Sequence, residues 1–433
     1  MWKNGVDPGQ PIFLTPYLEH GYIEQAREVS KLDSLRGIPL TSYAGFLTVN
    51  KQSNSNMYFW FFPAQENPSE APVLLWLQGG PGSSSLFGLF VENGPYTVLE
   101  DGTLTLKNIT WNKKYSMLYI DNPVGTGFSF TQNDEGYART ETDVAANLYN
   151  ALTQFFQIFT DYQKNDFYVT GESYGGKYVP AISYAIHTNN PKAQTKINFK
   201  GMAIGDGLCD PETMMDKYAS YMYSIGTLDE NQRDYFQQQT DTVVNLIKDK
   251  DYTAAFQVFD QLLLGGGYYQ NVSGSTDYYN FLRWQSPEAM GYYVQLLADP
   301  AVRKAIHVGN LTYNDGRKVQ EYLTNDFMQS VKPWIAVLMD NYKVMIYNGQ
   351  LDIIIAVPLT ESWLQTVPWS GLDDYKKAPR GIWKVNDDIA GYYRQVKNFY
   401  QIIVLGSGHI LPYDQPARGF DMIQRFVDSS GFS

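Results

Sequence analysis

A serine, an aspartate and a histidine follow one another along this 433-residue chain in the order of a hydrolytic triad. The serine, Ser173, is the centre of residues 171–175, which read GESYG and match the pattern G-x-S-x-G. A strand-like run, residues 166–170, precedes it and a helix-like run follows it, which is the setting of a nucleophile elbow. Glycines permit the sharp turn because they carry no side chain. We therefore predict that Ser173 is a nucleophile in a cleft at a helix N-terminus.

The histidine follows from elimination among the four in the chain. His20 precedes the serine, His187 lies in or just after the helix of the elbow, and His307 lies in a short apolar, helix-like stretch. His409 remains, in a glycine-containing loop after the strand-like run 399–404. Catalytic side chains of doubly wound sheets occupy such strand ends. We predict that His409 is the general base.

The acid is predicted from the same kind of position. Residues 343–347 form a buried-strand pattern that runs into a glycine turn and Asp352. Asp352 alone is an ordinary loop carboxylate in an acidic chain, but it lies between Ser173 and His409 in the order that the elbow motif requires. The three residues together predict nucleophilic catalysis, in which the acid fixes the histidine tautomer and stabilises the imidazolium.

Four further motifs extend the pattern over most of the chain. They are residues 76–85 (WLQGGPGSSS), 121–129 (DNPVGTGFS), 201–207 (GMAIGDG) and 408–416 (GHILPYDQP). With the triad, these motifs resemble the serine carboxypeptidase family, and residues 74–82 and 347–354 resemble its vitellogenic carboxypeptidase-like branch. The resemblance implies an α/β-hydrolase fold with a mostly parallel central sheet and an inserted helical cap. It also implies a serine-type carboxypeptidase that works through an acyl-enzyme at acidic pH, with peptide or protein C-termini as substrate.

The oxyanion of such a reaction needs two preorganised donors. The fold supplies the backbone N–H of the residue after the nucleophile, Tyr174, and the resemblance assigns the second donor to Gly80. The glycine-rich stretch around Gly80 has neither the Gly-Lys-Ser/Thr ending nor the G-x-G-x-x-G spacing of a nucleotide site. We therefore expect no nucleotide, and neither a cofactor nor a metal ion.

The resemblance also implies how the free C-terminus of the substrate is bound. Glu92 and Glu172 correspond to a hydrogen-bonded pair of glutamates that, with Gln78 and the amide of Gly79, holds the terminal carboxylate. Two carboxyls in contact retain one shared proton, because both cannot ionise easily. The protonated pair donates to a substrate carboxylate and the ionised pair repels it, so activity is expected to fall towards neutral pH. Gln78 stands where the broader family has asparagine.

Alternating strand-like and helix-like runs predict the organisation. The expected central strands are residues 73–77, 116–120, 167–170, 197–204, 344–347 and 399–404, with an antiparallel edge hairpin at 44–49 and 57–62. Residues 144–159 carry the apolar stripe of a core helix. We expect residues 1–207 and 324–433 to form the α/β-hydrolase core and residues 208–323 to form the cap, with helical runs over 231–263.

Composition and charge limit the partners and the cellular setting that the protein can have. A formal charge of −12 argues against nucleic acid or an anionic membrane as partner. No apolar stretch approaches 18 residues, and residues 1–8 do not resemble a signal peptide. Cys209 is the only cysteine, so no intrachain disulfide forms, and we expect it to be buried or inert.

The family and three glycosylation sequons, at Asn108, Asn271 and Asn310, favour a secreted or lysosomal location. A monomer and a homodimer are both compatible with the sequence.

Two other functions share these motifs. Relatives with the same triad transfer the acyl group to an alcohol instead of water, and the motifs do not distinguish them. The chain could also be a stabilising partner in a complex without catalysis. The intact set of triad and glutamates favours the carboxypeptidase.

Overall fold

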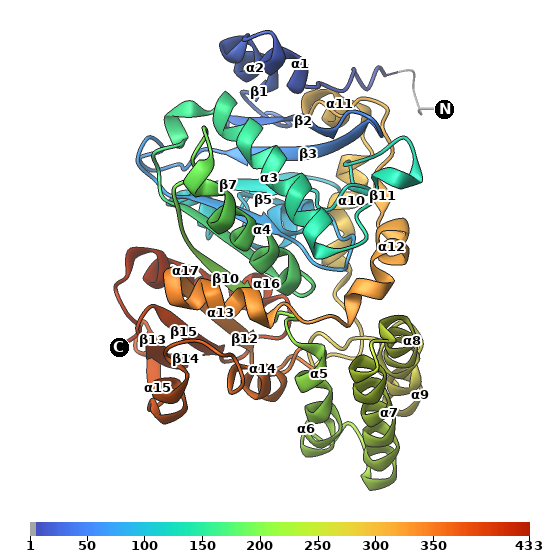
Figure 1. The fold of residues 1–433 in the computed structure, drawn as a ribbon. Helices are drawn as coiled ribbons and strands as arrows, with labels where there is room; N and C mark the ends of the chain where they lie inside the picture. The colour runs from blue at the N-terminus through green and yellow to red at the C-terminus, as the bar shows by residue number, and fades with distance from the viewer. Residues whose placement is uncertain (1–5) are drawn as a thin grey trace. The chain divides into compact units, whose positions relative to one another are not determined.

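The computed structural model describes residues 6–433 and divides them into two compact units (Figure 1). Of the described residues, unit 1 comprises 6–171, Ala181–Gly201 and Glu288–Tyr322, and unit 2 comprises Glu172–Pro180, Met202–Pro287 and Leu323–Ser433. Strands and helices alternate along both units. The predicted α/β class is therefore confirmed.

Unit 1 is built on strands in the order β1-β2-β3-β7-β4-β9. Their bounds are Lys31–Leu32, Ser42–Asn50, Ser55–Phe62, Ser116–Ile120, Val73–Leu77 and Phe167–Glu172. β2 and β3 form the predicted antiparallel hairpin, and β4 runs parallel to both β7 and β9. Every residue of β4 and β7 is buried, as expected for apolar strands of a parallel sheet that is covered on both faces.

The core helix predicted at 144–159 is α3, Glu141–Ile158. It begins with a capping box, in which Thr140 accepts from the Asp143 N–H and the Asp143 carboxylate accepts from the Thr140 N–H. The buried stripe of α3 includes Phe155, whose ring lies 5.0 Å from that of Phe61 on β3. This aromatic packing joins the helix to the hairpin.

Several shorter elements complete unit 1, and two helices, α4 and α12, cross its boundary with unit 2. They are α1 (Thr15–Glu19), α2 (Ile23–Ser30), β5 (Tyr96–Val98), β6 (Leu104–Leu106), β8 (Thr126–Gly127), α4 (Gly175–Asn189), α10 (Tyr292–Leu297), α11 (Pro300–Ala305), β11 (Asn314–Asp315) and α12 (Arg317–Phe327). β5 pairs with β6 and β8 pairs with β11, each antiparallel.

Unit 2 carries strands in the order β10-β12-β15-β14-β13. Their bounds are Phe199–Gly205, Lys343–Gly349, Phe399–Val404, Asp388–Val396 and Gly381–Val385. β12 and β15 are parallel and in register from Val344 opposite Phe399 to Gly349 opposite Val404. The chain segments that follow these two strands therefore leave from the same edge of the sheet.

The hairpin of β13 and β14 is an element that the sequence analysis did not predict. Asn386 and Asp387 connect its strands with φ of 50° and 67°. Two successive left-handed residues make the turn that suits the twist of an antiparallel pair. The Asn-Asp pair was the local signal for this hairpin.

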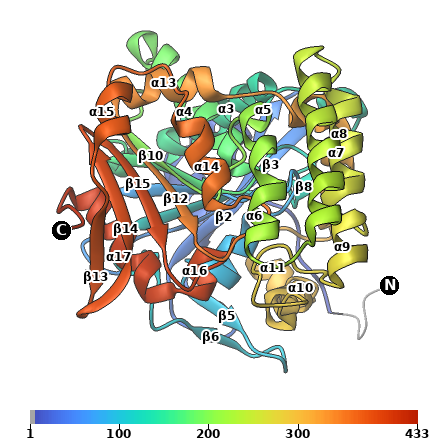
Figure 2. The same cartoon turned by 90° about the horizontal axis from the view of Figure 1, so that it is seen from below.

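The helical runs predicted over 231–263 are two helices, α7 (Glu230–Lys248) and α8 (Tyr252–Leu263) (Figure 2). Lys250, between them, has a left-handed φ of 63°, and the Asp251 carboxylate caps α8 by accepting from the Ala254 N–H at 3.2 Å. The predicted helical runs are therefore two helices, and the chain changes direction between them at Lys250.

The other helices of unit 2 lie in the same segment and in the C-terminal part. They are α5 (Pro211–Met214), α6 (Tyr218–Ser224), α9 (Tyr268–Ser273), α13 (Lys332–Asn341), α14 (Val357–Leu364), α15 (Leu372–Lys377), α16 (Leu411–Asp414) and α17 (Pro416–Asp428). The division between the compact units falls within the predicted cap, after Pro287, and the cap boundaries 208–323 stay a prediction.

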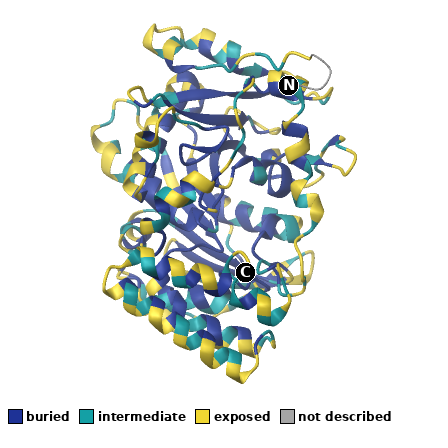
Figure 3. Cartoon of the chain, turned by 90° about the vertical axis from the view of Figure 1, so that its right-hand side faces the viewer, coloured by how far each residue is buried: buried dark blue, intermediate teal, exposed yellow. Residues whose placement is uncertain are grey.

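Burial follows the strands (Figure 3). The strands β4, β7 and β15 are buried along their whole length, whereas exposed residues are concentrated on helices and loops. Among residues 6–433, no helix combines the length and apolar character that crossing a membrane requires.

Candidate active site

Ser173 lies at the turn between β9 and α4 and is partly exposed. Its φ of 61° is left-handed, which is uncommon for a residue with a side chain and is the kind of strained turn that a nucleophile elbow requires. Two backbone hydrogen bonds hold it: its N–H donates to the Gly205 carbonyl, and the Leu208 N–H donates to its carbonyl, both at 3.0 Å. The segment after β10 therefore fixes the turn.

Gly176 shows how closely this segment approaches the turn. A Cβ at Gly176 would lie 2.6 Å from the Leu208 nitrogen and 2.7 Å from the Gly207 Cα. Both are backbone atoms, which cannot rotate away. Glycine is required here because any side chain would push the segment after β10 away from Ser173.

Asp352 and His409 meet, as the sequence predicted from their strand ends. Asp352 follows β12, and His409 follows β15. The His409 Nδ1 lies 2.7 Å from the Asp352 Oδ2, and both side chains are at most 1% exposed. An ionised carboxylate only accepts, so Nδ1 carries the proton and donates. The in-register parallel pairing of the two strands brings these loops together.

The pair is oriented by contacts from three other segments. The Asp352 Oδ1 accepts from the Ile354 N–H at 3.0 Å, and the Tyr221 hydroxyl of α6 donates to the Asp352 carbonyl at 2.9 Å. The Tyr279 ring stacks on the imidazole with centroids 4.9 Å apart, and the His409 N–H donates to the Tyr279 carbonyl at 2.7 Å. The imidazole is thus held in one plane.

The Nε2 of His409 is buried and has no hydrogen-bond partner among the described residues. With the proton on Nδ1, this nitrogen carries the lone pair, and the imidazole can accept a proton there. A fixed tautomer with an uncommitted basic nitrogen is the chemical state of a general base.

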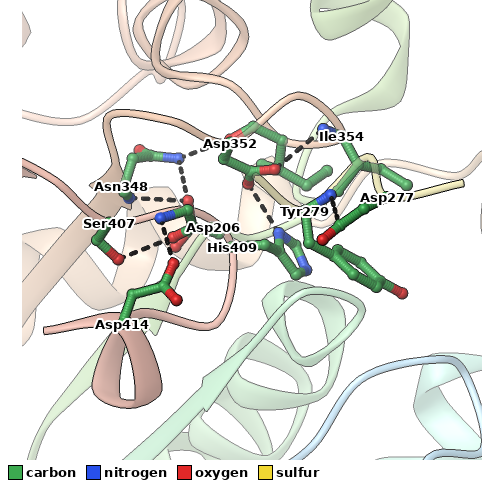
Figure 4. A network of polar contacts seen from close by, with 12 residues as sticks. Asp206, Asp277, Tyr279, Asn348, Asp352, Ile354, Ser407, His409 and Asp414 are labelled. Atoms are coloured by element: carbon green, nitrogen blue, oxygen red, sulfur yellow. Dashed lines mark hydrogen bonds and ion pairs between the residues drawn. The ribbon is translucent and has the colours of Figure 1, made fainter. Parts of the chain in front are cut away.

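The loop that carries His409 is held by Asp414. Its Oδ2 accepts from the Gly408 N–H at 2.7 Å (Figure 4). The Oδ2 also accepts from the Asn280 amide at 3.1 Å, and the Oδ1 accepts from the Arg283 guanidinium at 2.6 Å. The Asp414 side chain is 3% exposed, so its carboxylate is stabilised by these protein hydrogen-bond donors and not by bulk water.

Asp206 also lies in this site, and the sequence analysis did not identify it. It follows β10 directly, with a left-handed φ of 44°, and is fully buried. One ligand atom each from Asp206, Asp352 and His409 lie within 4.8 Å of one another. The available signal was its position, because the ends of neighbouring parallel strands share one edge of a sheet.

The residues predicted to bind the substrate carboxylate and the oxyanion are distributed over both units. Gln78, Gly79, Gly80 and Glu92 belong to unit 1, and Glu172 and Tyr174 belong to unit 2. In unit 1 the Gln78 Oε1 accepts from the Trp76 indole at 2.9 Å, Gly80 has a φ of 112°, and Glu92 is buried at the end of a π-helical turn, Gly88–Glu92. In unit 2 Glu172 and Tyr174 are buried. Their predicted cooperation stays a prediction.

The other sequence candidates have simple environments. His307 lies after α11 rather than in a helix, and its ring Nδ1 donates to the Ala44 carbonyl at 2.9 Å. Cys209 is buried, as predicted, and burial raises the pKa of its thiol. Asn108, Asn271 and Asn310 are all exposed.

Comparisons with known proteins agree on one family. The model of the serine carboxypeptidases matches residues 34–429. The chain is 56% identical to a probable serine carboxypeptidase CPVL of Homo sapiens, over 98% of this chain and 91% of that protein. It is 50% identical to a venom serine carboxypeptidase of Apis mellifera, over 98% and 92%, and 42% identical to a vitellogenic carboxypeptidase of Aedes aegypti, over 97% and 90%.

A solved structure shows the same fold. The prohormone-processing carboxypeptidase KEX1(delta)p of Saccharomyces cerevisiae superposes with a TM-score of 0.82, covering 93% of this chain and 96% of that one, at 22% identity.

Proposed function

The chain belongs to the serine carboxypeptidase family and has its α/β-hydrolase fold, and from this premise we propose that it removes C-terminal amino acids from peptides through an acyl-enzyme on Ser173. The observation that carries the proposal is the His409 imidazole, whose Nδ1 donates to Asp352 at 2.7 Å while the buried Nε2 has no partner. The strained φ of Ser173 supports the assignment of the nucleophile.

In the proposed reaction, the Nε2 of His409 accepts the proton of the Ser173 hydroxyl as its oxygen attacks the scissile carbonyl carbon. The imidazolium then donates that proton to the leaving amine as the C–N bond breaks, and the acyl-enzyme remains. Water attacks the ester by the same proton route and releases the shortened peptide. Asp352 stabilises the imidazolium through the Nδ1 hydrogen bond and does not itself become protonated.

The backbone N–H groups of Tyr174 and Gly80 are proposed to bind the oxyanion. Tyr174 lies at the turn that leads into α4, and the backbone N–H groups at a helix N-terminus favour an anion. Gly80 belongs to a glycine loop whose positive φ no larger residue adopts easily. Donors of this kind contribute about 3 kcal/mol each to transition-state stabilisation.

Glu92, Glu172, Gln78 and Gly79 are proposed to bind the substrate's terminal carboxylate. Both glutamates are at most 2% exposed, and buried carboxyls favour the neutral form. A neutral carboxyl donates to a carboxylate, so the proposal requires a proton on this pair. Activity is therefore highest at acidic pH and decreases as the pair loses its proton.

We extend the proposal to the environment of the enzyme. Its substrates are peptide or protein C-termini, and it is a secreted or lysosomal protein, as a monomer or a homodimer. The exposed sequons Asn108, Asn271 and Asn310 support the secretory route, and the relative from Apis mellifera is named as a venom protein.

Release of the C-terminal amino acid from a blocked dipeptide, measured from pH 4 to 8, tests the proposal. The wild type is expected to be most active at acidic pH, Ser173→Ala to be inactive, and Glu172→Gln to have a changed pH profile. A fluorophosphonate should label the wild type and not Ser173→Ala. Labelling without amino-acid release at any pH would contradict the exopeptidase and point to acyl transfer, and an absence of labelling would contradict the nucleophile.

A further inference from the structure

The segment of Gly205 and Asp206 connects the two halves of the proposed triad, through the backbone of Gly205 and the side chain of Asp206. The Gly205 carbonyl accepts from the Ser173 N–H at 3.0 Å, and the Asp206 Oδ1 accepts from the Gly349 N–H at 3.0 Å. The first bond fixes the nucleophile turn, and the second fixes the loop that carries Asp352. A substitution at Asp206 can therefore affect both the Ser173 turn and the loop that carries Asp352.

The two oxygens of Asp206 have different surroundings (Figure 4). Oδ1 accepts two hydrogen bonds, from the Gly349 N–H and from the Asn348 amide at 3.4 Å. Oδ2 is buried and has no donor among the described residues. A carboxylate oxygen in this position carries an unpaired charge, whereas the hydroxyl of a neutral acid has a proton to donate.

The acceptor for such a proton is the carboxylate of Asp352. Asp206 and Asp352 are both 0% exposed, and their oxygens belong to the cluster that lies within 4.8 Å. Two charges so close and so buried repel strongly, and one retained proton converts this repulsion into a hydrogen bond.

The tyrosines that the structure describes beside the pair supply no balancing charge. Tyr221 and Tyr218 of α6 donate to the carbonyls of Asp352 and Ile354, and burial raises the pKa of Tyr218, Tyr221 and Tyr279, so these hydroxyls are neutral.

The two other carboxyls of this region have their own donors: Asp277 accepts from the Tyr279 N–H at 2.8 Å, and Asp414 accepts from Arg283. Among residues 6–433, no lysine or arginine pairs with Asp206. Burial, followed by the charge of Asp352, raises the pKa of Asp206 well above its usual value.

We propose that Asp206 is a positioning residue held as the neutral acid, whose Oδ2–H donates to Asp352. The proposal rests on the proposed function, because it assigns Asp352 to the triad. Because Asp206 keeps its proton, the pair carries a single negative charge, which is located on the carboxylate that faces His409. It also gives Asp352 a third donor beside Ile354 and His409, so the carboxylate cannot rotate away from the imidazole.

The same three side chains could offer ligands to a cation, but their geometry favours the shared proton. The His409 Nδ1 and the Asp352 Oδ2 are 2.7 Å apart, which is a hydrogen-bond distance. Ligand atoms about 2.0 Å from a tetrahedral zinc ion stand about 3.3 Å apart. An imidazole nitrogen that carries a proton has no lone pair for a metal.

Asp206→Asn is the decisive variant, because the amide can donate to Asp352 and accept from the Gly349 N–H without a charge. We expect kcat/KM for the blocked dipeptide to stay within about threefold of the wild type. The acid limb of its pH profile, which reports protonation of the catalytic imidazole, is expected to stay in place. If Asp206 were ionised instead, removal of its charge would move this limb to lower pH by about one unit or more.

Asp206→Leu has nearly the same size but neither donates nor accepts. We expect kcat to fall by about a hundredfold with little change in KM, because a misplaced catalytic group costs about that much. A purely structural role would instead reduce the melting temperature of both variants and leave the kcat of the folded enzyme unchanged.

The matched control is Asp210→Asn, the same change at a buried carboxylate that binds Lys332 at 2.7 Å. It is expected to lower the melting temperature and to leave the acid limb in place. At pH 6 to 7, an infrared difference spectrum should show a protonated carboxyl band that Asp206→Asn removes and Asp210→Asn retains.

The outcomes separate this inference from the proposed function. If a fluorophosphonate does not label Ser173, the proposed triad itself is contradicted. Three results in an active wild-type enzyme would contradict the neutral Asp206 without contradicting the proposed hydrolase. They are a shifted acid limb in Asp206→Asn, an infrared spectrum without the protonated carboxyl band, and loss of activity in EDTA.

Discussion

Two buried aspartates, Asp121 in unit 1 and Asp206 in unit 2, are at most 1% exposed and differ in what their oxygens meet. Asp121 accepts on both oxygens: Ser84 and the Ser85 N–H donate to Oδ1, and the Phe128 N–H donates to Oδ2 at 2.8 Å. Asp206 accepts on one oxygen only.

The difference shows that donors and neighbouring charges, together with burial, decide the protonation of a carboxyl. Burial raises the pKa of Asp121 to about 7, although its three donors act in the opposite direction. At Asp206, burial and the nearby carboxylate of Asp352 both raise the pKa. We infer that Asp121 titrates within the working range of an acidic enzyme and that Asp206 stays neutral throughout it.

The largest expected effect comes from removing the partner of Asp206. Asp352→Asn leaves the geometry of the loop intact but supports the wrong histidine tautomer, so kcat for the blocked dipeptide should fall by about 10⁴-fold. The comparison predicts a second result: without the charge of Asp352, only burial remains of the two main causes that raise the pKa of Asp206. Its infrared carboxyl band should then titrate at lower pH than in the wild type, and an unmoved band would contradict the shared proton.

A smaller effect is expected from Asp121→Asn, which tests the other side of the comparison. A carboxyl with a raised pKa in the folded state stabilises fully below its unfolded value near 4, and this stability is lost as pH rises to about 7. The wild type should therefore lose on the order of 1 to 4 kcal/mol of unfolding free energy over that range.

Urea unfolding at pH 4, 5.5 and 7 measures this slope. Asp121→Asn should be less stable at every pH, because an amide cannot accept on both atoms, and its slope should be shallower. An unchanged slope would mean that Asp121 is ionised throughout.

The smallest effect is expected at Cys209, which lies near Asp206 in the sequence but has no charge to share. Its Sγ donates to the Gly176 carbonyl at 3.4 Å and is fully buried. Because burial raises the pKa of the thiol, the native protein should react with a thiol reagent only as fast as it unfolds. Cys209→Ala should retain the wild-type kcat and pH profile and lose about 1 kcal/mol of stability. A large loss of kcat in Cys209→Ala would show that any substitution in the segment after β10 impairs catalysis. Loss of activity in an Asp206 variant would then be no evidence for a specific role of Asp206.

Much of the fold could be predicted because its signals are local. β4, β7 and β15 have the bounds that their apolar runs gave, and α3 follows its apolar stripe. The hairpin of β13 and β14 was not predicted, and neither was the position of the break between α7 and α8 at Lys250. Both depend on left-handed residues, which the periodicity of apolar residues does not reveal.

For the site, the sequence alone determined which residue types could react and their order along the chain. Ser173 is marked by a glycine turn, and Asp352 and His409 are marked by strand ends, all of which are properties of short segments. The tertiary structure alone decided which side chains share a proton. The Asp352–His409 hydrogen bond depends on the register of β12 with β15, and the environment of Asp206 depends on β10 lying next to β12. Protonation is set by the donors and charges within a few ångströms, and residues far apart in the sequence supply them.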